Sequence, residues 1–311
     1  MPLCRINVAG ADLAAPGQAR ARLRAALERT APGAPVVVLV HGYKFSPSND
    51  RTSPHTHILS LAPARACRKA LSWPRELGLG TGETAEPLCI ALGWEARGSL
   101  WKAYGRAPHT GLALARLIAL IRDLRPRQRV DVLAHSLGCR VALSALPHLP
   151  AGAMGRAVLM APAEMRSVAR ARLDCPAGRA VEVINVTSRE NGLYDRALEW
   201  LVAPHRFGDR ALGAGLSRLA GNWTDINIDD RATRDLLAAQ GYPVAASDRR
   251  VCHWSVYLRP GLFPFYRAVL DRKIPLAALR IPDASPAPSP FWSRLAQLAG
   301  RPLEIGDRQP S

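Results

Sequence analysis

The sequence of 311 residues contains no stretch of about 20 uninterrupted apolar residues, which is the length that a membrane-spanning helix needs. Its start, MPLCRINVAGADLAAPGQAR, also lacks the basic and then apolar layout of a secretory signal. With 48% hydrophobic and 22% charged residues, the composition is typical of a globular protein. We therefore expect a protein of the cytoplasm.

Metal and nucleotide motifs are also lacking. The six cysteines form no CxxC pair, so the sequence predicts reduced, mostly buried thiols and no disulfide framework. His55 and His57 form a lone HxH pair without nearby cysteines or carboxylates, which is a weak metal-site pattern. The glycines at Gly78, Gly80 and Gly82 are not followed by the lysine of a phosphate-binding loop.

Lysine is scarce, although the chain is strongly basic. Only four of the 42 basic residues are lysines, and the net charge of +17 comes mostly from arginines spread along the whole chain. Because no basic block or basic and aromatic motif is present, we expect no specific nucleic-acid partner. The charge still allows weak, salt-sensitive association with anionic lipid surfaces.

Strand-like runs alternate with stretches of helical periodicity. The run of valines within residues 34–43 suits a strand buried on both faces of a parallel sheet. Further strand-like runs lie at residues 87–94, 129–134, 155–164 and 180–188, and residues 110–124 have the spacing of a helix. This order predicts an α/β fold with a doubly wound, mostly parallel sheet flanked by helices. The opening CRINVAG adds an edge strand.

Composition also predicts the domain organisation. We expect one domain over residues 1–280, with cap-like insertions at about 45–86 and 203–250 that interrupt the alternation of strands and helices. Residues 281–311 begin with the proline-rich IPDASPAPSP, a linker by composition, and continue with FWSRLAQLAG, which can form a short amphipathic helix.

One serine joins a strand-like run to a helical run in the stretch VDVLAHSLGCRVALSAL. Serine is common at such joins as a turn or N-cap residue. Here AHSLG also has the small-x-Ser-x-Gly spacing of a nucleophile elbow, in which a serine at strained backbone angles needs small neighbours. Gly138 meets this need, and Ala134 takes the place of the more usual glycine. Ser136 is therefore the candidate nucleophile.

A serine is a poor nucleophile at neutral pH and needs a base that is held by an acid. In an elbow enzyme with this kind of sheet, the order along the chain is serine, acid, histidine. His253, in the aromatic setting HWSVY, is the candidate base. His135 directly precedes the serine on a sharp turn, so its side chain points away and is expected to orient the turn.

The sequence leaves the acid open. Asp195 begins the helical run DRALEWL, where a capping carboxylate can still hold an imidazole. Glu190 directly follows a predicted strand end, where a catalytic acid usually projects. We favour Asp195 and keep Glu190 as the alternative, with Asp225 and Asp229 as more distant candidates.

An acyl-transfer site also needs backbone N–H groups that face the developing oxyanion. The amide of Leu137, directly after the serine, is one candidate. The amide of Tyr43, in the HGYKF segment after the first buried strand, is the other. Trp94 and Trp101, in a stretch rich in tryptophan, glycine and arginine, either line the cleft or pack beside it.

Taken together, VVVLVHGYKF, AHSLGCRVAL, VTSRENGLYDRALEWL and HWSVYL resemble the α/β-hydrolase superfamily, over roughly residues 36–270. The resemblance implies a serine hydrolase that cleaves carboxylic esters of a small-molecule acyl substrate, without a metal or organic cofactor. Acyltransferase, thioesterase and amidase chemistry use the same apparatus. A contrasting alternative is a non-catalytic binding protein that retains the sheet.

Overall fold

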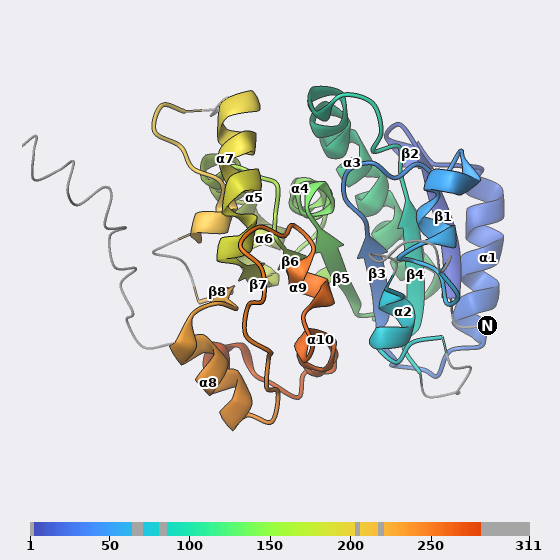
Figure 1. Ribbon diagram of the computed structural model, residues 1–311. Coiled ribbons are helices and arrows are strands. Elements are labelled where there is room, and N and C mark those ends of the chain that lie inside the picture. The colour runs from blue at the N-terminus through green and yellow to red at the C-terminus, as the bar shows by residue number, and fades with distance from the viewer. Residues whose placement is uncertain (1–2, 64–70, 81–85, 203–205, 217–220, 281–311) are drawn as a thin grey trace, which may run out of the picture. The chain divides into compact units, whose positions relative to one another are not determined.

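Eight strands form one sheet in the order β2-β1-β4-β3-β5-β6-β7-β8 (Figure 1). The structure is a computed structural model that describes residues 3–63, 71–80, 86–202, 206–216 and 221–280. β2 pairs antiparallel with β1, and the other neighbouring strands are parallel. The strands are β1 (Leu3–Ala9), β2 (Asp12–Leu13), β3 (Val36–Val40), β4 (Leu88–Gly93), β5 (Val130–His135), β6 (Met154–Met160), β7 (Glu182–Thr187) and β8 (Trp223–Asn227).

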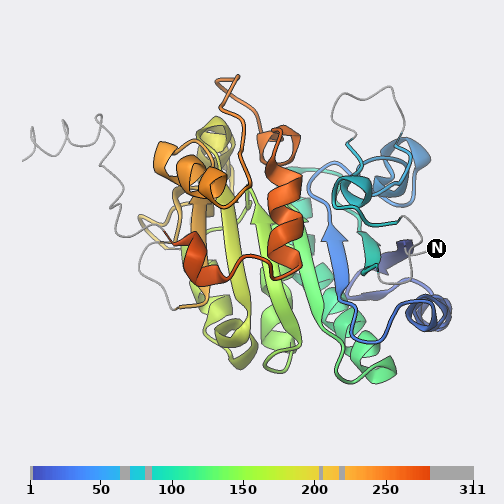
Figure 2. The same ribbon diagram turned by 90° about the horizontal axis from the view of Figure 1, so that it is seen from below.

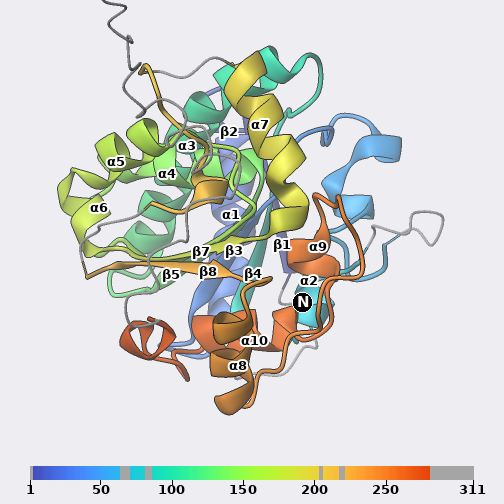
Figure 3. The same cartoon turned by 60° about the vertical axis from the view of Figure 1, so that its left-hand side comes forward.

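Helices cover both faces of this sheet, and Figure 3 shows the two layers. One face packs against α1 (Pro16–Glu28), α3 (Leu100–Leu124), α4 (Leu137–Ala145), α5 (Arg166–Leu173) and α6 (Pro176–Ala180). The other face packs against α2 (Trp73–Glu76), α8 (Arg231–Ala239) and α10 (Leu262–Leu270), the last of which lies in front of the strands in Figure 2. α7 (Gly192–Leu201) follows β7, and α9 (Ser255–Leu258) precedes α10.

β3 shows why a continuous apolar run builds this sheet. All five of its residues are buried. Val36, Val38 and Val40 belong to the core on one face, whereas Val37 and Leu39 belong to the core on the other. Because successive side chains of a strand point to opposite faces, a strand covered on both sides needs apolar residues at every position. The predicted mostly parallel, doubly wound sheet is confirmed.

Two predicted segments differ from the structure. The helix expected at residues 110–124 begins ten residues earlier, because Ser99 caps it through a hydrogen bond to the amide of Lys102 and α3 continues through Pro108. The segment 203–250, expected as an insertion over the cleft, contributes β8 and α8 to the sheet and its outer layer. As an edge strand with one neighbour, β8 has only a weak apolar pattern.

Three further predicted segments remain, of which the last lies outside the described residues. The CRINVAG run forms β1, between β2 and β4. Within residues 45–86, the described part forms short 3₁₀ turns and α2. The linker and helix predicted at 281–311 lie outside the described residues. Residues Met1–Arg280 form one compact unit.

No helix within the described ranges is both long enough and apolar enough to cross a membrane.

The carboxyl ends of β3, β5 and β7, which lie along one edge of the sheet, carry the residues of the candidate site. His41 follows β3, Ser136 follows β5, and Asn191 ends a short turn after β7. Ligands of open α/β sheets bind at this edge, beyond the carboxyl ends of the strands. The fold therefore places the candidate nucleophile where such sheets carry their sites.

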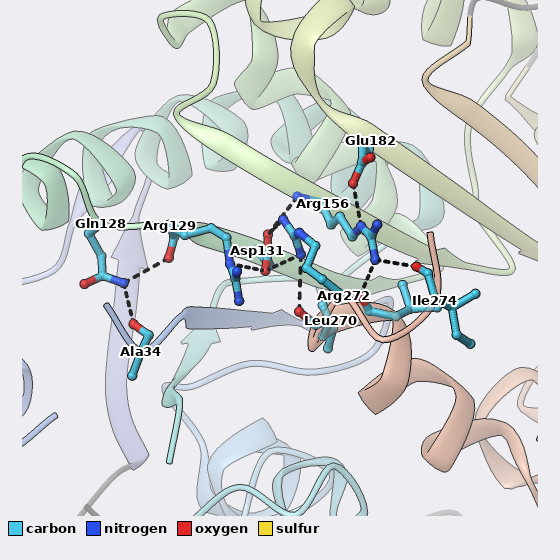
Figure 4. A network of polar contacts seen from close by, with 10 residues as sticks. Ala34, Gln128, Arg129, Asp131, Arg156, Glu182, Leu270, Arg272 and Ile274 are labelled. Atoms are coloured by element: carbon cyan, nitrogen blue, oxygen red, sulfur yellow. Dashed lines mark hydrogen bonds and ion pairs between the residues drawn. The ribbon is translucent and has the colours of Figure 1, made fainter. Parts of the chain in front are cut away.

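A buried polar network anchors the opposite end of β5 (Figure 4). Asp131 is fully buried, and both of its carboxylate oxygens accept hydrogen bonds of 2.9 Å from Arg272, which follows α10. The Asp131 carboxylate also accepts from the backbone amide of Arg156 at 2.8 Å. The Arg156 side chain in turn donates to Glu182 at 2.5 Å and to the carbonyl of Ile274 at 3.1 Å. These contacts hold the C-terminal segment of the described chain against the sheet.

We expect Asp131→Asn to lower the free energy of unfolding by about 3 kcal/mol, because it removes one partner of a buried ion pair. The matched control is Asp12→Asn, which removes the exposed pair between Asp12 and Arg116 and should cost less than about 1 kcal/mol. Urea unfolding of both variants measures the difference. An equal loss of stability in the two variants would contradict the assigned role of Asp131.

Candidate active site

Ser136 occupies a strained turn between β5 and α4. Its backbone angles are φ 56° and ψ −122°, a conformation that is unfavourable for a residue with a side chain. The turn is held from β6, because the amide of Ser136 donates to the carbonyl of Met160 at 3.0 Å and its carbonyl accepts from the amide of Ala163 at 3.1 Å. Ala134, at the first small position of the motif, is fully buried. This geometry is that of a nucleophile elbow.

Two glycines allow the loop after β3 to approach this turn. A Cβ atom at Gly138 would lie 2.5 Å from the carbonyl oxygen of Val40 and 2.7 Å from that of His41. A Cβ atom at Gly42 would lie 2.7 Å from the Cβ of Ser136. Contacts this short do not occur between real side chains and backbone. Glycine at both positions therefore lets the HGY segment lie directly against the serine.

His253 lies at hydrogen-bond distance from the serine. Its Nε2 atom is 2.9 Å from Ser136 Oγ, and its Nδ1 atom is 2.6 Å from Oδ1 of Asn191. Because the amide oxygen of Asn191 can only accept, Nδ1 carries the proton and Nε2 accepts from the serine hydroxyl. The imidazole thus has the tautomer that a general base for Ser136 requires.

The residue that holds the imidazole is an asparagine, whereas the sequence favoured a carboxylate. Asn191 stands between His253 and the predicted acid, since its Nδ2 donates to Oδ1 of Asp195 at 2.9 Å. Asp195 lies one helical turn beyond Asn191 in α7 and reaches the histidine only through this amide. The predicted direct contact between Asp195 and His253 is therefore corrected to a chain of Ser136, His253, Asn191 and Asp195.

The alternative acid, Glu190, faces away from the histidine. Its carboxylate is buried and accepts from Arg259 at 2.6 Å and from the Ser247 hydroxyl at 2.5 Å. Successive residues of the short turn after β7 point to different sides, so Asn191 faces His253 while Glu190 faces Arg259. The carbonyl of Glu190 accepts from the amide of Cys252 at 3.0 Å, which ties this turn to the loop that carries His253.

The two more distant candidates have structural partners. Asp229 pairs with Arg259 at 2.7 Å, and its carboxylate accepts from the hydroxyl of Ser188 at 2.8 Å. These interactions lower the pKa of Asp229 even though burial opposes them. Asp225 accepts from Asn185 at 2.7 Å and from the amide of Leu216 at 2.8 Å, at the edge of the sheet. Neither carboxylate has a hydrogen bond to His253.

The two residues whose amides are predicted to bind an oxyanion belong to segments next to the serine. Leu137 directly follows Ser136, and Tyr43 follows the glycine that contacts the serine Cβ. Among the described residues, neither N–H donates to an acceptor of the protein. Both amides therefore remain candidates for an oxyanion site, which needs N–H groups without a protein acceptor.

A buried histidine fixes the loop that carries Tyr43. His41 is fully buried, and burial lowers its pKa to about 3, so the ring is neutral at physiological pH. Its Nε2 accepts from the amide of Trp94 at 3.1 Å, and its Nδ1 donates to the carbonyl of Gly42 at 2.9 Å. The indole of Trp94 donates back to the carbonyl of His41 at 2.9 Å. The sequence left open whether Trp94 lines the cleft or packs beside it. Its side chain is fully buried, so it packs.

His135 has a role that the sequence did not indicate. Burial lowers its pKa to about 4, and its Nε2 lies 3.1 Å from the carbonyl oxygen of His253. A neutral His135 that donates from Nε2 therefore positions the backbone of the candidate base. Its ring also packs edge-on against Tyr257, at 5.1 Å between ring centroids.

Another buried ion pair joins α4 to the segment after β6. Arg140 of α4 donates to Glu164 at 2.5 and 2.7 Å, and the hydroxyl of Tyr104 donates to the same carboxylate at 2.8 Å. Glu164 is fully buried and also accepts from the amide of Met165 at 2.9 Å. This network joins α3, α4 and the segment after β6, so it fixes the helix that begins at the nucleophile.

The two histidines of the lone HxH pair contact protein side chains. His55 lies 2.6 Å from Oδ1 of Asn7 through its Nε2 atom, and burial lowers its pKa to about 4. The ring of His57 packs edge-on against Phe45. No group of three or more metal-ligating side chains occurs in the part of the chain that the structure describes.

Asp195 should make stability depend on pH in an unusual direction. Burial, with a further contribution from Glu199, raises its pKa from 3.8 to about 7. Between these two values the folded chain keeps a proton that the unfolded chain has lost, so stability falls as pH rises. Asp195→Asn should therefore raise the free energy of unfolding by about 1–2 kcal/mol near pH 8 and have little effect near pH 4. Urea unfolding of the parent and the variant across this pH range tests the prediction. A difference in free energy of unfolding that does not change with pH would contradict it.

The doubly wound sheet, with a serine on a strained turn after β5, defines the α/β-hydrolase class. The chain belongs to the family described as alpha/beta hydrolase of unknown function (DUF900), which residues 16–240 match. Among solved structures it is similar to the phospholipase PlaB from Legionella pneumophila in complex with thio-NAD, with 14% identity and a TM-score of 0.33. That match covers 58% of this chain and 43% of PlaB, so the chain spans less than half of PlaB. No curated protein sequence matches it significantly.

Proposed function

We propose that the protein is a serine hydrolase that cleaves carboxylic esters through an acyl-enzyme. The observation that carries the proposal is the 2.9 Å contact between Ser136 Oγ and His253 Nε2 at a strained elbow. Membership of an α/β-hydrolase family supports hydrolysis in general. The ester as substrate, and the role of each residue, are our inference from the geometry.

The proposed reaction begins when Ser136 Oγ attacks the ester carbonyl carbon while His253 Nε2 takes the hydroxyl proton. The amides of Leu137 and Tyr43 donate to the resulting oxyanion. As the tetrahedral intermediate collapses, the bond to the alcohol breaks and Nε2 gives its proton to the leaving oxygen. A water that loses its proton to Nε2 then attacks the acyl-enzyme, which releases the carboxylic acid and returns the proton to Ser136.

In this scheme Asn191 orients the imidazole and accepts the Nδ1 proton in a hydrogen bond at every step. An asparagine has the same role in papain-like cysteine proteases. Because its oxygen is neutral, it stabilises the imidazolium less than a carboxylate would. Asp195 compensates in part, since its ionised form polarises the Asn191 amide through the 2.9 Å hydrogen bond. Asp195 is thus a positioning residue that acts through Asn191.

The test is turnover of p-nitrophenyl esters of increasing acyl length by the purified full chain. We expect saturable hydrolysis, with a burst of p-nitrophenol equal to the enzyme concentration where deacylation is slow. Parallel assays with thioesters, amides and an added alcohol acceptor distinguish the related acyl-transfer reactions. A folded protein without turnover of any of these substrates would favour the non-catalytic binding protein instead.

A further inference from the structure

Exposed apolar side chains gather on α7 and its neighbours. In the described part of the chain, four of the seven exposed large apolar side chains lie on α7, and a fifth contacts α7 from α3. A sixth, Phe207, lies in the segment 206–216, which is joined to α7 by the pair between Arg210 and Glu199. Trp200 is 80% exposed, and Phe207 is fully exposed. Trp101 joins them from α3, because its indole donates to the carbonyl of Leu201 at 2.6 Å. We call this group the α7 surface; its residues are Trp101, Leu193, Tyr194, Trp200, Leu201 and Phe207.

The spacing along α7 puts these side chains on its outer side. Leu193 and Trp200 are seven residues apart, as are Tyr194 and Leu201, so each pair is two helical turns apart on one face. The inner side is already occupied, since Leu198 is buried in the core. In Figures 1 and 3 α7 lies at the periphery of the described unit. A helix with an apolar outer face needs an occupant for that face.

The charges around the α7 surface favour an anionic occupant. Lys102, Arg196, Arg206 and Arg210 are exposed. The two acids of α7 have partners: Glu199 is mostly buried and paired with Arg210 at 2.9 Å, and Asp195 accepts from Asn191. Exposed aromatic side chains surrounded by cations match a lipid bilayer with anionic headgroups, where the rings enter the interface and the cations meet phosphates.

A cavity beside Phe207 is suited to such a headgroup. Its volume is about 680 Å³, and four arginines line it together with Phe207: Arg166, Arg170, Arg206 and Arg210. Its two acids already have hydrogen-bond partners, because Asp209 accepts from the amide and hydroxyl of Ser167, which also lines the cavity, and Asp174 pairs with Arg179. Two of the arginines have partners as well, since Arg166 donates to the carbonyls of Ala214 and Gly215 and Arg210 pairs with Glu199. Burial and the like charges of Arg210 and Arg170 lower the pKa of Arg166, although the carboxylates of Asp225 and Asp209 act against them. A phosphodiester anion at this cavity would accept charge-assisted hydrogen bonds from arginine side chains.

The α7 surface is continuous with the candidate active site. α7 begins directly after Asn191, and the ring of Tyr194 stacks on His253 at 4.7 Å between centroids. Ser136 itself is only 4% exposed. Tyr194 therefore connects the α7 surface directly to the candidate base.

We propose that the α7 surface docks on bilayers that contain anionic phospholipid, with Trp200 and Phe207 in the interface and a lipid phosphate in the arginine cavity. Docking is independent of catalysis. That the docked lipid also supplies the ester rests on the proposed function.

Co-sedimentation of the full chain carrying Ser136→Ala with vesicles tests docking without turnover. We expect binding to vesicles of phosphatidylcholine with phosphatidylglycerol to be about tenfold or more tighter than to phosphatidylcholine alone, and to weaken as salt rises. Trp200→Ser with Phe207→Ser, and separately Arg170→Glu with Arg206→Glu, should each weaken binding about tenfold or more.

The matched control is Arg20→Glu with Arg24→Glu. Both arginines are exposed on α1, well apart from α7 in Figure 1, and the change of net charge equals that of the arginine-cavity variant. We expect this control to bind nearly as well as the parent. An equal loss in the control would assign binding to net charge and overturn the proposal, as would no binding to anionic vesicles. A dimer in solution that Trp200→Ser dissociates would assign the surface to a second copy and would also overturn it.

Discussion

Ser136→Ala should reduce ester hydrolysis to background, a loss on the order of 10⁶-fold in kcat. In the proposed reaction Oγ of Ser136 forms the bond to the acyl carbon, so no other side chain can substitute for it. The variant should remain folded, because the elbow is held by backbone hydrogen bonds that do not involve the side chain: the Ser136 amide donates to Met160, and the Ser136 carbonyl accepts from Ala163. Circular dichroism and urea unfolding check the fold, and p-nitrophenyl ester turnover measures the loss.

His253→Ala is the companion change, with a loss of similar size, and the double variant should be no worse than either single variant. Groups that act as one unit lose their joint contribution when any member is removed. Losses that multiply in the double variant would show that the two residues act independently. Full activity of a folded Ser136→Ala chain would contradict the account outright.

Asn191→Ala should reduce kcat by about 10²–10⁴-fold, because the imidazole then loses the partner that fixes its tautomer and orientation. Asn191→Asp should stay within about tenfold of the parent, since its carboxylate oxygen can accept from Nδ1 in the same place. The new carboxylate would lie beside Asp195, so one of the two would hold a proton near neutral pH.

The pH profile of kcat separates this orienting role from a structural one. Asn191→Asp should shift the pH dependence of turnover, whereas Asn191→Ala should lower the whole profile. Asp195→Asn keeps an acceptor for the Asn191 amide and serves as the control for the hydrogen bond between Asn191 and Asp195. Parent-like turnover in a folded Asn191→Ala chain would remove Asn191 from the catalytic group and reopen the choice between the predicted carboxylates.

The sheet could be predicted because each buried strand must be apolar at every position. The valines of β3 and the run before Ser136 show this pattern. The elbow could be predicted because the strained turn at the serine requires small residues two positions before and two positions after it. β8 escaped prediction for the opposite reason: an edge strand with Asp225 exposed needs few apolar residues. The early start of α3 was hidden by Pro108, which normally ends a helix.

The partner of His253 could not be predicted from chain order alone. Asn191 and Glu190 are adjacent, and only the turn after β7 decides which of them faces the histidine. The sequence does not show whether the Glu190 carboxylate pairs with Arg259 or with the imidazole of His253. The signal was present in the spacing of Asn191 and Asp195, four residues apart, which allows an amide and a carboxylate to pair along one helix face.

The roles of His41 and His135 were equally hidden, because a buried neutral imidazole has no sequence signature apart from its apolar surroundings. Both rings hold loops of the site through backbone atoms, one at Gly42 and the other at His253. Glu164 and Arg140 were missed for a similar reason, since their pairing joins segments that are distant in the chain.

The most direct test of the central claim is mass spectrometry of the purified chain after treatment with a fluorophosphonate, which reacts with activated serines. We expect one adduct, on Ser136, that is absent from Ser136→Ala and strongly reduced in His253→Ala. A folded parent chain that forms no adduct, or forms it on another residue, would contradict the claim that Ser136 and His253 make an activated nucleophile.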